Sequence, residues 1–348
     1  MVAPLDWGLG HATRCIPLIR YVSEKGCKVT IAGEGQVKAL MEREFPGMEI
    51  LPLKGYRIYY PKKGWMFVAK IILQLPKIIL AVQHERNWLK KQAGNWDLVI
   101  SDNRYGLCAP NTPCVLITHQ LAPVSGLGNW ADKLLSTFLN RWIYRFHSCW
   151  IPDEANDVGI AGVLSHPAIL PVKSRYIGPL SRMQYKKTEQ KGHILVILSG
   201  PEPQRSLLEN ILIRELELLD EEVVFVRGLP TPATVPDSVK RIRFENHLDA
   251  GALEAAMAEA ELVVCRSGYS SVMDLLAMRK KAVLIPTPGQ TEQLYIASHL
   301  EKRGWFVVQQ QETLQLRQGI AKTRSLSPDL LPHFHFEGFK QAFSDLGI

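Results

Sequence analysis

The chain has 348 residues, of which 46% are apolar and 22% are charged, and its 25 glycines follow no periodic repeat. This composition excludes collagen-like, coiled-coil and largely disordered proteins, and the length predicts two packed domains. The 41 basic and 34 acidic residues give a net charge of +7, which suits an anionic partner. Because the surplus is spread along the whole chain, we do not expect a nucleic-acid partner.

Short apolar runs separated by helical patterns predict a parallel sheet wound by crossover helices in each half of the chain. In the first half, the expected strands cover residues 2–5, 28–32, 49–52, 98–101, 114–118 and 148–151. In the second half, they cover residues 193–198, 223–227, 242–245, 262–265, 282–286 and 306–308. We therefore predict an α/β protein with a first Rossmann-like domain over 1–178, a linker over 179–190, a second Rossmann-like domain over 191–335 and a C-terminal helix over 336–348.

The six cysteines form no Cys-x-x-Cys pair, so they predict neither a zinc site nor a disulfide framework. Reduced thiols in the cytoplasm are the simplest expectation. The first residues, Met-Val-Ala-Pro-Leu, are typical of a strand rather than of a signal peptide. This strand is short, so we expect its first residues to lie upstream of Met1.

A strongly apolar stretch, WMFVAKIILQLPKIILAV, covers residues 65–82 and contains Lys70, Lys77 and a central Pro76. It is too short and too interrupted to predict a membrane span. One interpretation is a core helix that is broken or kinked at Pro76. The other is a partly exposed apolar surface, with lysines, that touches a membrane or a lipid-linked substrate.

A glycine-rich turn, Gly8-x-Gly10-His11, follows the first strand and leads into a helical pattern over residues 15–25. Glycines at such a turn let another molecule approach the backbone at a helix N-terminus. Thr13 replaces the third glycine of the dinucleotide fingerprint, so a nicotinamide cofactor is disfavoured. His11 lies where open α/β sheets bind ligands and is a candidate general base, the alternative being a histidine that only braces the turn.

Asp102 follows the strand over 98–101 and would orient the His11 imidazole, although a loop-capping role is also open. Polar and glycine residues on the same side of the sheet are candidates to contact a hydroxylated acceptor. They are Gly8, Gly10, Arg14, Asn103, Arg104, His119 and Gln120. A purely structural role for His119 stays open.

The second half carries a more specific pattern after the strand over 262–265, where a turn leads into a helix with hydroxyl groups in its first turn. The candidate residues there are Arg266, Ser267, Gly268, Ser270, Ser271 and Asp274. Backbone N–H groups and hydroxyls at such a helix start hold phosphate oxygens, and an acidic residue one turn later accepts hydrogen bonds from a ribose diol. The alternative is that Ser270 and Asp274 only cap the helix.

Two further turns in the second half are candidates for a nucleotide-sugar site. Gln290, Glu292 and Gln293 follow the strand over 282–286 and carry the groups that fix the hydroxyl pattern of a sugar. Ser199 and Gly200 form a possible phosphate-facing turn after the strand over 193–198. Pro201 and Pro203 remove backbone donors from that turn and weaken this interpretation.

These motifs resemble those of the GT-B glycosyltransferases, and most closely family 28, in the Gly8-x-Gly10-His11 turn, the segment 177–182 and the block 263–304. The sequence Gly-x-Gly-His-Ala-Thr-Arg is also similar to a group of uncharacterised bacterial and archaeal relatives. The resemblance implies two Rossmann-like domains whose parallel sheets face each other across a cleft, with a UDP-sugar held by the second domain.

The same resemblance implies roles for individual residues. It puts Ser270 and Ser271 near phosphate, Asp274 at the ribose, and Glu292 with Gln293 at the sugar. It further implies that Arg182 neutralises the pyrophosphate and that His247 and Leu248 edge the base. The family's acceptor-side Asn motif is not reproduced in residues 119–122, so a peptidoglycan acceptor does not carry over.

The sequence thus predicts an inverting transferase that moves a sugar from a UDP-sugar donor to a hydroxyl acceptor. No cofactor other than this donor substrate is expected, and the lack of an Asp-x-Asp triplet predicts independence of metal. We expect a lipid-linked or cell-envelope acceptor and a cytoplasmic enzyme with peripheral contact at the inner face of the membrane. A UDP-sugar epimerase or hydrolase of the same fold and a non-catalytic nucleotide-sugar-binding protein remain as alternatives.

Overall fold

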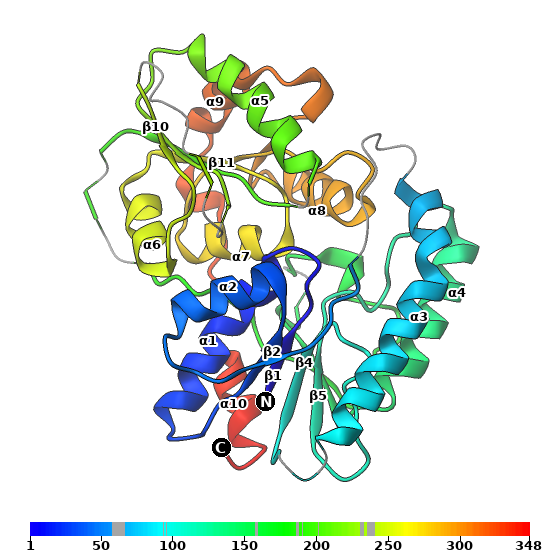
Figure 1. Cartoon of the computed structure of the whole chain (residues 1–348). Helices are drawn as coiled ribbons and strands as arrows, with labels where there is room; N and C mark the ends of the chain where they lie inside the picture. Colours follow the sequence, from blue (N-terminus) through cyan, green and yellow to red (C-terminus); the bar gives the residue numbers. More distant parts are fainter. Residues whose placement is uncertain are drawn as a thin grey trace. The chain divides into compact units, whose positions relative to one another are not determined.

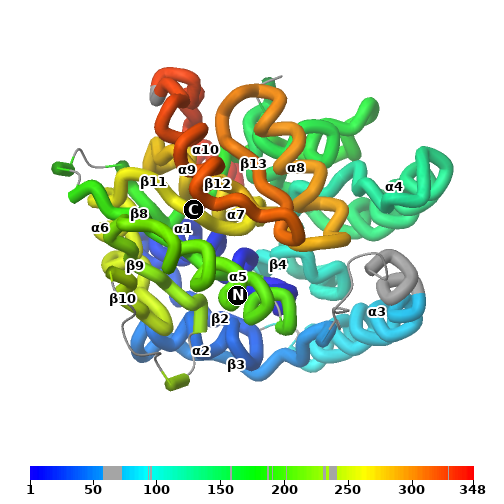
Figure 2. Tube along the Cα trace, turned by 90° about the horizontal axis from the view of Figure 1, so that it is seen from above, coloured from blue at the N-terminus to red at the C-terminus, as the bar shows by residue number. Residues whose placement is uncertain are grey.

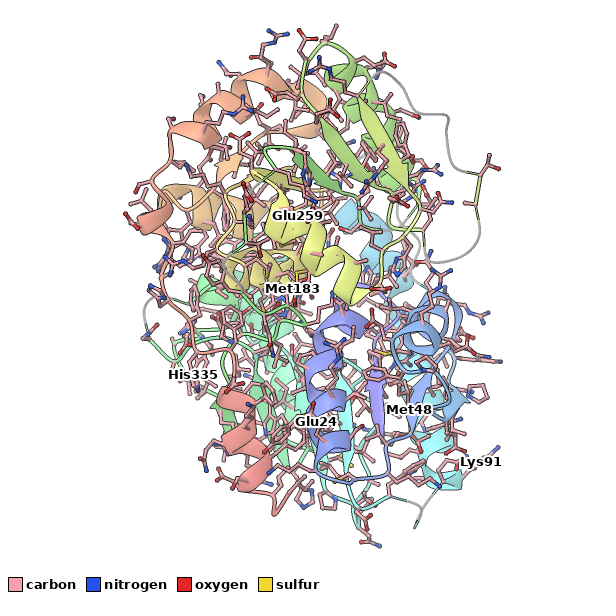
Figure 3. The ribbon with its side chains drawn as sticks, turned by 90° about the vertical axis from the view of Figure 1, so that its left-hand side faces the viewer. Glu24, Met48, Lys91, Met183, Glu259 and His335 are labelled. Carbon is pink, nitrogen blue, oxygen red and sulfur yellow. The ribbon has the colours of Figure 1, made fainter. Side chains whose placement is uncertain are left out.

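The computed structural model describes residues 1–57, 67–92, 94, 96–156, 159–185, 188–189, 191–200, 202–229, 233–234 and 241–348. The described residues divide into two compact units (Figure 1). The first holds residues 1–57 and Val68–Leu180 together with the C-terminal segment Phe334–Ile348. The second is Ser181–His333. Figure 3 labels Met183 just after the first change of unit and His335 just after the second.

The first unit contains a parallel sheet of seven strands in the order β3-β2-β1-β4-β5-β6-β7. The strands are β1 (Val2–Pro4), β2 (Ile31–Gly33), β3 (Ile50–Pro52), β4 (Val99–Asp102), β5 (Cys114–Ile117), β6 (Ser148–Ile151) and β7 (Ser174–Tyr176). The order reverses between β1 and β4, and open α/β sheets bind ligands at the carboxyl ends of the two strands that flank such a reversal.

Helices cover both faces of this sheet. They are α1 (Gly10–Glu24), α2 (Gly35–Glu44), α3 (Phe67–Lys91), α4 (Asn129–Ile143), the short 3₁₀ helix η2 (Gly162–Leu164) and α10 (Gly338–Ser344). Trp88 of α3 and Trp142 of α4 pack against the same core cluster, so both helices lie on one face. On the other face, Phe343 of α10 contacts Trp150 of β6, with ring centroids 4.9 Å apart, and Tyr21 of α1 at 5.5 Å. The C-terminal helix therefore belongs to the core of the first unit.

The second unit contains a parallel sheet of six strands in the order β10-β9-β8-β11-β12-β13 (Figure 2). The strands are β8 (Ile194–Ile197), β9 (Val223–Val226), β10 (Ile242–Glu245), β11 (Leu262–Cys265), β12 (Ala282–Leu284) and β13 (Val307–Val308). The helices are α5 (Gln204–Glu217), α6 (Ala250–Glu259), α7 (Tyr269–Ala277), α8 (Thr291–Lys302) and α9 (Leu316–Ser325), with 3₁₀ turns η3 (Gln311–Thr313) and η4 (Pro328–Leu330). Here the order reverses between β8 and β11, which identifies a second edge suited to ligands.

The predicted class of two parallel-sheet α/β domains is confirmed, whereas several element boundaries are wrong. Helix α1 starts at Gly10 rather than near residue 15, so His11 lies in its first turn. Helix α3 continues through Pro76 to Lys91, so the proline does not end it. Val82 and Leu89 of the same helix belong to the core cluster, and this packing offsets the loss of one backbone hydrogen bond at the proline. Strand β7 was not predicted, because Ser-Arg-Tyr at a sheet edge has no apolar run.

The linker predicted over 179–190 and the apolar stretch over 65–82 lie partly outside the described residues, as does the side chain of Lys70. No helix in the described parts of the chain is both long enough and apolar enough to span a bilayer.

Candidate active site

The reversal in the first sheet brings His11 and Asp102 together. Pro4 at the end of β1 pairs with Asp102 at the end of β4, and α1 begins six residues after Pro4. The His11 ring lies beside the Asp102 carboxylate, with 2.9 Å between Nδ1 and Oδ1. The His11 side chain is 15% exposed, whereas that of Asp102 is fully buried. The contact predicted from the motifs is therefore present in the structure.

Arg14, one turn further along α1, is the second partner of Asp102. Its Nε donates to Asp102 Oδ2 at 2.6 Å, and its Nη2 donates to Oδ1. Burial opposes ionisation of Asp102, but the charges and hydrogen bonds of Arg14 and His11 outweigh it and hold the pKa of the carboxyl well below its usual range. Asp102 is therefore a carboxylate that accepts hydrogen bonds and donates none.

This protonation state assigns the His11 tautomer. Since Asp102 only accepts, the proton in the contact lies on His11 Nδ1, which assigns the tautomer of the neutral imidazole with its lone pair on Nε2. Arg14 Nη2 is also 3.0 Å from Nδ1, and with Nδ1 protonated both nitrogens donate to the same Oδ1. Arg14 Nη1 lies 3.1 Å from Nδ1 of His119, which accepts and so carries its hydrogen on Nε2. One buried guanidinium thus fixes opposite tautomers on two histidines.

The two residues after Asp102 are both buried but differ in their contacts. Asn103 adopts a left-handed backbone with φ of 53°, and its buried Oδ1 has no hydrogen-bond partner among the described residues. Arg104 is fully buried, donating from Nε to the Pro4 carbonyl and from Nη1 to Glu85 Oε1, both at 2.9 Å. Arg104 therefore braces the sheet edge. Of the remaining acceptor-side candidates, Gln120 is half-buried and donates its N–H to Thr118 Oγ1.

Glu85 of α3 was not among the predicted residues, although it contacts Arg104 in the loop after β4. Its Oε2 also accepts hydrogen bonds from Tyr56 Oη at 3.1 Å and from the Gly106 N–H at 3.0 Å. Burial raises the pKa of Glu85 to about 7, against the opposing effect of Arg104. A lone acidic residue on the core side of an apolar helix was the signal in the sequence that would have identified it.

In the second unit, Arg266 holds together three loops at the carboxyl edge. It is fully buried and donates from Nη2 to the Gln204 carbonyl at 2.9 Å and from Nη1 to the Pro286 carbonyl at 3.2 Å. Burial lowers its pKa to about 10. Arg266 was a candidate donor contact, but its guanidinium is used to tie the loops after β8, β11 and β12 to one another.

The loops after β11 and β12 are also joined by side chains. Ser267 Oγ donates to the Gln293 carbonyl, and the Thr287 N–H donates to Gln293 Oε1, both at 2.9 Å. Gly268 caps α7 and lies beside Gln293 and Ser271. Ser270 and Ser271 are half-buried in the first turn of α7, and Gln290 and Glu292 are half-buried at the start of α8. The predicted phosphate and sugar residues thus lie on two neighbouring loops of one sheet edge.

Asp274 and Arg182 are brought together as well. Asp274 Oδ1 accepts a hydrogen bond from Ser181 Oγ at 2.6 Å, and Oδ2 lies 3.8 Å from Arg182 Nε. Burial raises the pKa of Asp274, and Arg182 opposes that effect. The other predicted donor residues lie on separate loops of the same unit, with Ser199 and left-handed Gly200 after β8 and with His247 and Leu248 just before α6.

Comparison with known proteins identifies relatives that are named glycosyltransferases. Residues 249–338 match the family model of the glycosyltransferase family 28 C-terminal domain. The chain is 23% identical over 337 residues to the UDP-N-acetylglucosamine--N-acetylmuramyl-(pentapeptide) pyrophosphoryl-undecaprenol N-acetylglucosamine transferase of Buchnera aphidicola, covering 92% of this chain and 88% of that protein. It is 22% identical over 338 residues to an uncharacterized glycosyltransferase of Methanosarcina mazei, covering 86% and 82% of the two chains.

Solved structures share the fold at low identity. The glycotransferase of kitacinnamycin superposes with a TM-score of 0.65 at 15% identity, covering 95% of this chain and 91% of that one. MurG of Acinetobacter baumannii superposes with a TM-score of 0.54 at 15% identity, covering 99% and 98%. The chain is therefore a glycosyltransferase with a two-domain, Rossmann-like GT-B fold, whose second unit carries the family 28 match.

Proposed function

We propose that this protein transfers a sugar from a UDP-sugar to a hydroxyl acceptor with inversion at the anomeric carbon, and that His11 is the general base. The observation that carries the proposal is the contact of His11 with buried Asp102 and Arg14 at the edge where β1 and β4 end. A histidine with a lone pair on one ring nitrogen and a fixed carboxylate at the other is the arrangement that proton abstraction requires.

In the proposed reaction, the acceptor oxygen forms a bond to the anomeric carbon as the bond to the UDP oxygen breaks. His11 Nε2 takes the hydroxyl proton during this attack. Asp102 then stabilises the imidazolium, because it stays ionised next to Nδ1. The proton returns to solvent after UDP leaves, so the products are UDP, the glycosylated acceptor and one proton.

The donor half of the proposal rests on the second unit. The N-terminus of α7, with Ser270 and Ser271, and the guanidinium of Arg182 would stabilise the leaving diphosphate in place of a divalent metal. Asp274 would meet the ribose, and Glu292 with Gln293 would meet the sugar. The family 28 match over residues 249–338 supports this half.

We also propose a lipid-linked or cell-envelope acceptor, reached from the cytoplasmic face of a membrane. Helices α3 and α4 expose large apolar side chains, with Leu73 at 74%, Leu80 at 70%, Trp130 at 71% and Phe138 at 58% exposure. Lys77 is exposed on α3. Exposed apolar groups beside a lysine suit the boundary between headgroups and acyl chains. The name of the Buchnera relative, which specifies an undecaprenol-linked acceptor, supports this class.

The donor assignment is tested by thermal unfolding in the presence of UDP, ADP, dTDP and GDP. A ligand that binds only the folded state raises the midpoint. We expect UDP to raise it most, and we expect Ser271→Ala to reduce that shift. The absence of a shift with UDP, or an equal shift with all four nucleotides, would contradict the assignment of a uridine donor.

A further inference from the structure

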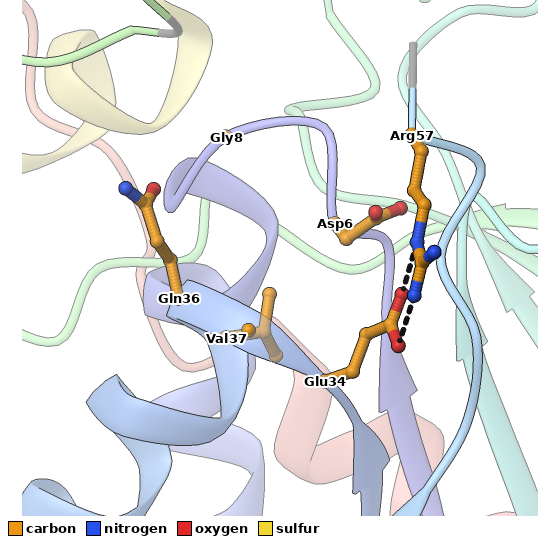
Figure 4. Close-up of a pocket in the computed structure, with 7 residues that line it drawn as sticks. Asp6, Gly8, Glu34, Gln36, Val37 and Arg57 are labelled. Atoms are coloured by element: carbon orange, nitrogen blue, oxygen red, sulfur yellow. Dashed lines mark hydrogen bonds and ion pairs between the residues drawn. The ribbon is translucent and has the colours of Figure 1, made fainter.

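A pocket of about 370 Å³ lies at the carboxyl ends of β1 and β2, in the first unit (Figure 4). Its walls include Asp6 and Gly8 from the segment after β1, Glu34, Gln36 and Val37 from the start of α2, and Arg57 from the segment after β3. Gly8 precedes His11 by three residues. The volume falls at the lower end of the range for small-molecule sites, roughly 300–1,000 Å³.

The charged wall of the pocket is held in place by specific contacts. Arg57 donates from Nε and Nη2 to the two oxygens of Glu34, both at 2.9 Å (Figure 4). Glu34 Oε1 also accepts the Gly55 N–H at 2.9 Å. A Cβ at Gly55 would lie 1.7 Å from Asp6 Oδ2, so only glycine lets this segment pack so closely on Asp6. The adjoining Tyr56 N–H then donates to Asp6 Oδ1 at 2.9 Å.

These contacts leave a defined set of groups for a ligand. Asp6 Oδ2 receives no hydrogen bond from any described residue, and in Figure 4 the Asp6 carboxylate faces the Arg57 side of the pocket. The carboxamide of Gln36 is exposed and offers both a donor and an acceptor. Val37 lies behind these groups and is only 2% exposed. Carboxylate and carboxamide groups that line one pocket suit the hydroxyl groups of a sugar.

The charge of the pocket argues against a phosphate. Asp6 and Glu34 contribute two negative charges and Arg57 one positive charge, which gives a net charge of one negative. Both Arg57 nitrogens that face Glu34 are already used in the ion pair. A phosphate would meet an uncompensated carboxylate at Asp6, whereas a neutral polyol would donate hydrogen bonds to it.

We propose that the pocket of Asp6, Glu34, Gln36 and Arg57 is a subsite for an uncharged sugar ring of the acceptor, separate from any phosphate that the acceptor carries. Gly8, which lines the pocket, belongs to the turn that leads to His11 in the first turn of α1. The inference rests on the proposed function, because it assumes that the acceptor binds to the first unit.

The test uses saturation-transfer NMR with methyl glucoside, methyl galactoside and methyl mannoside, and with inorganic pyrophosphate as an anionic probe followed by ³¹P line broadening. Asp6→Asn keeps an oxygen for the Tyr56 N–H, so it removes the charge with little effect on folding. Gln36→Ala removes the second polar group from an exposed position. Glu42→Gln, on the exposed side of α2 beside Lys38, is the matched control for loss of a carboxylate.

We expect at least one glycoside to bind the wild type and the Glu42→Gln control, and its affinity to fall about tenfold in Asp6→Asn, as for loss of a hydrogen bond to a charged group. A smaller loss is expected in Gln36→Ala. The inference is overturned if no glycoside binds, if Asp6→Asn binds as the wild type does, or if pyrophosphate competes for the pocket.

Thermal stabilisation by UDP, measured on the same samples, separates the two proposals. A protein that UDP stabilises but that binds no glycoside contradicts only the subsite. A protein that UDP does not stabilise contradicts the donor assignment, whatever the glycosides do.

Discussion

Replacing Asp102 with Asn probes the buried ion pair on which the active-site geometry depends. Arg14 and Asp102 are both buried and share two hydrogen bonds, one of them 2.6 Å long. The variant leaves the Arg14 guanidinium buried without its counter-charge, and breaking one side of such a pair costs about 3–5 kcal/mol. Since domains are stable by roughly 5–15 kcal/mol, this loss is large enough to measure easily.

The matching variant is Arg14→Met, made alone and together with Asp102→Asn. In the double variant neither charge remains, so most of the lost stability should return, with a coupling energy of at least about 2 kcal/mol. Urea unfolding followed by tryptophan fluorescence is the appropriate assay, because seven of the eight tryptophans precede residue 180 and only Trp305 follows it. A loss below about 1 kcal/mol in Asp102→Asn, or purely additive effects, would refute the reasoning.

Three further predictions follow from other parts of the first unit. Because burial raises the pKa of Glu85 to about 7 from 4.5, the folded state binds the extra proton, so stability should fall by roughly 3 kcal/mol as the pH rises from 4.5 through 7. Glu85→Gln should flatten that dependence in urea titrations at each pH, and an unchanged slope would count against it. Gly55→Ala should cost about 1–3 kcal/mol, because its Cβ would collide with Asp6, and wild-type stability would show that the segment adapts freely. Leu80→Glu with Phe138→Glu should weaken sedimentation with anionic vesicles without changing the unfolding midpoint, and equal sedimentation would remove these helices from the membrane contact.

The sequence was sufficient to predict the sheets because buried parallel strands are short, continuous apolar runs. β6, β10 and β11 have the predicted bounds, whereas β7 has no such run and was missed. The extent of α3 was underestimated because a proline usually signals a helix boundary, and here its cost is absorbed by core packing.

Part of the site was predictable for a similar reason. His11 and Asp102 each follow a strand, and parallel strands end at one edge, so their proximity followed from the topology. The arginines were harder to interpret. Arg104 and Arg266 have the sequence positions of ligand contacts, but they are buried and donate to backbone carbonyls. Whether a guanidinium faces a ligand or a carbonyl depends on tertiary packing, which a single sequence does not reveal.

The pocket at the ends of β1 and β2 could not have been predicted from strand ends alone. It depends on a salt bridge between Arg57 and Glu34 and on the lack of a side chain at Gly55, so the segment after β3 has to meet the start of α2.

The central claim, that His11 is the base of a sugar transfer, is tested most directly by the rate of UDP release from a UDP-sugar that stabilises the protein, with methyl glycosides as acceptors, in the wild type and in His11→Ala. Calorimetric titration of UDP on both proteins is the companion measurement. We predict a rate lowered by about 10²–10⁴-fold, the usual contribution of general-base catalysis, with the UDP dissociation constant unchanged. Wild-type turnover in His11→Ala, or a loss of UDP affinity that accounts for the whole effect, would contradict the account.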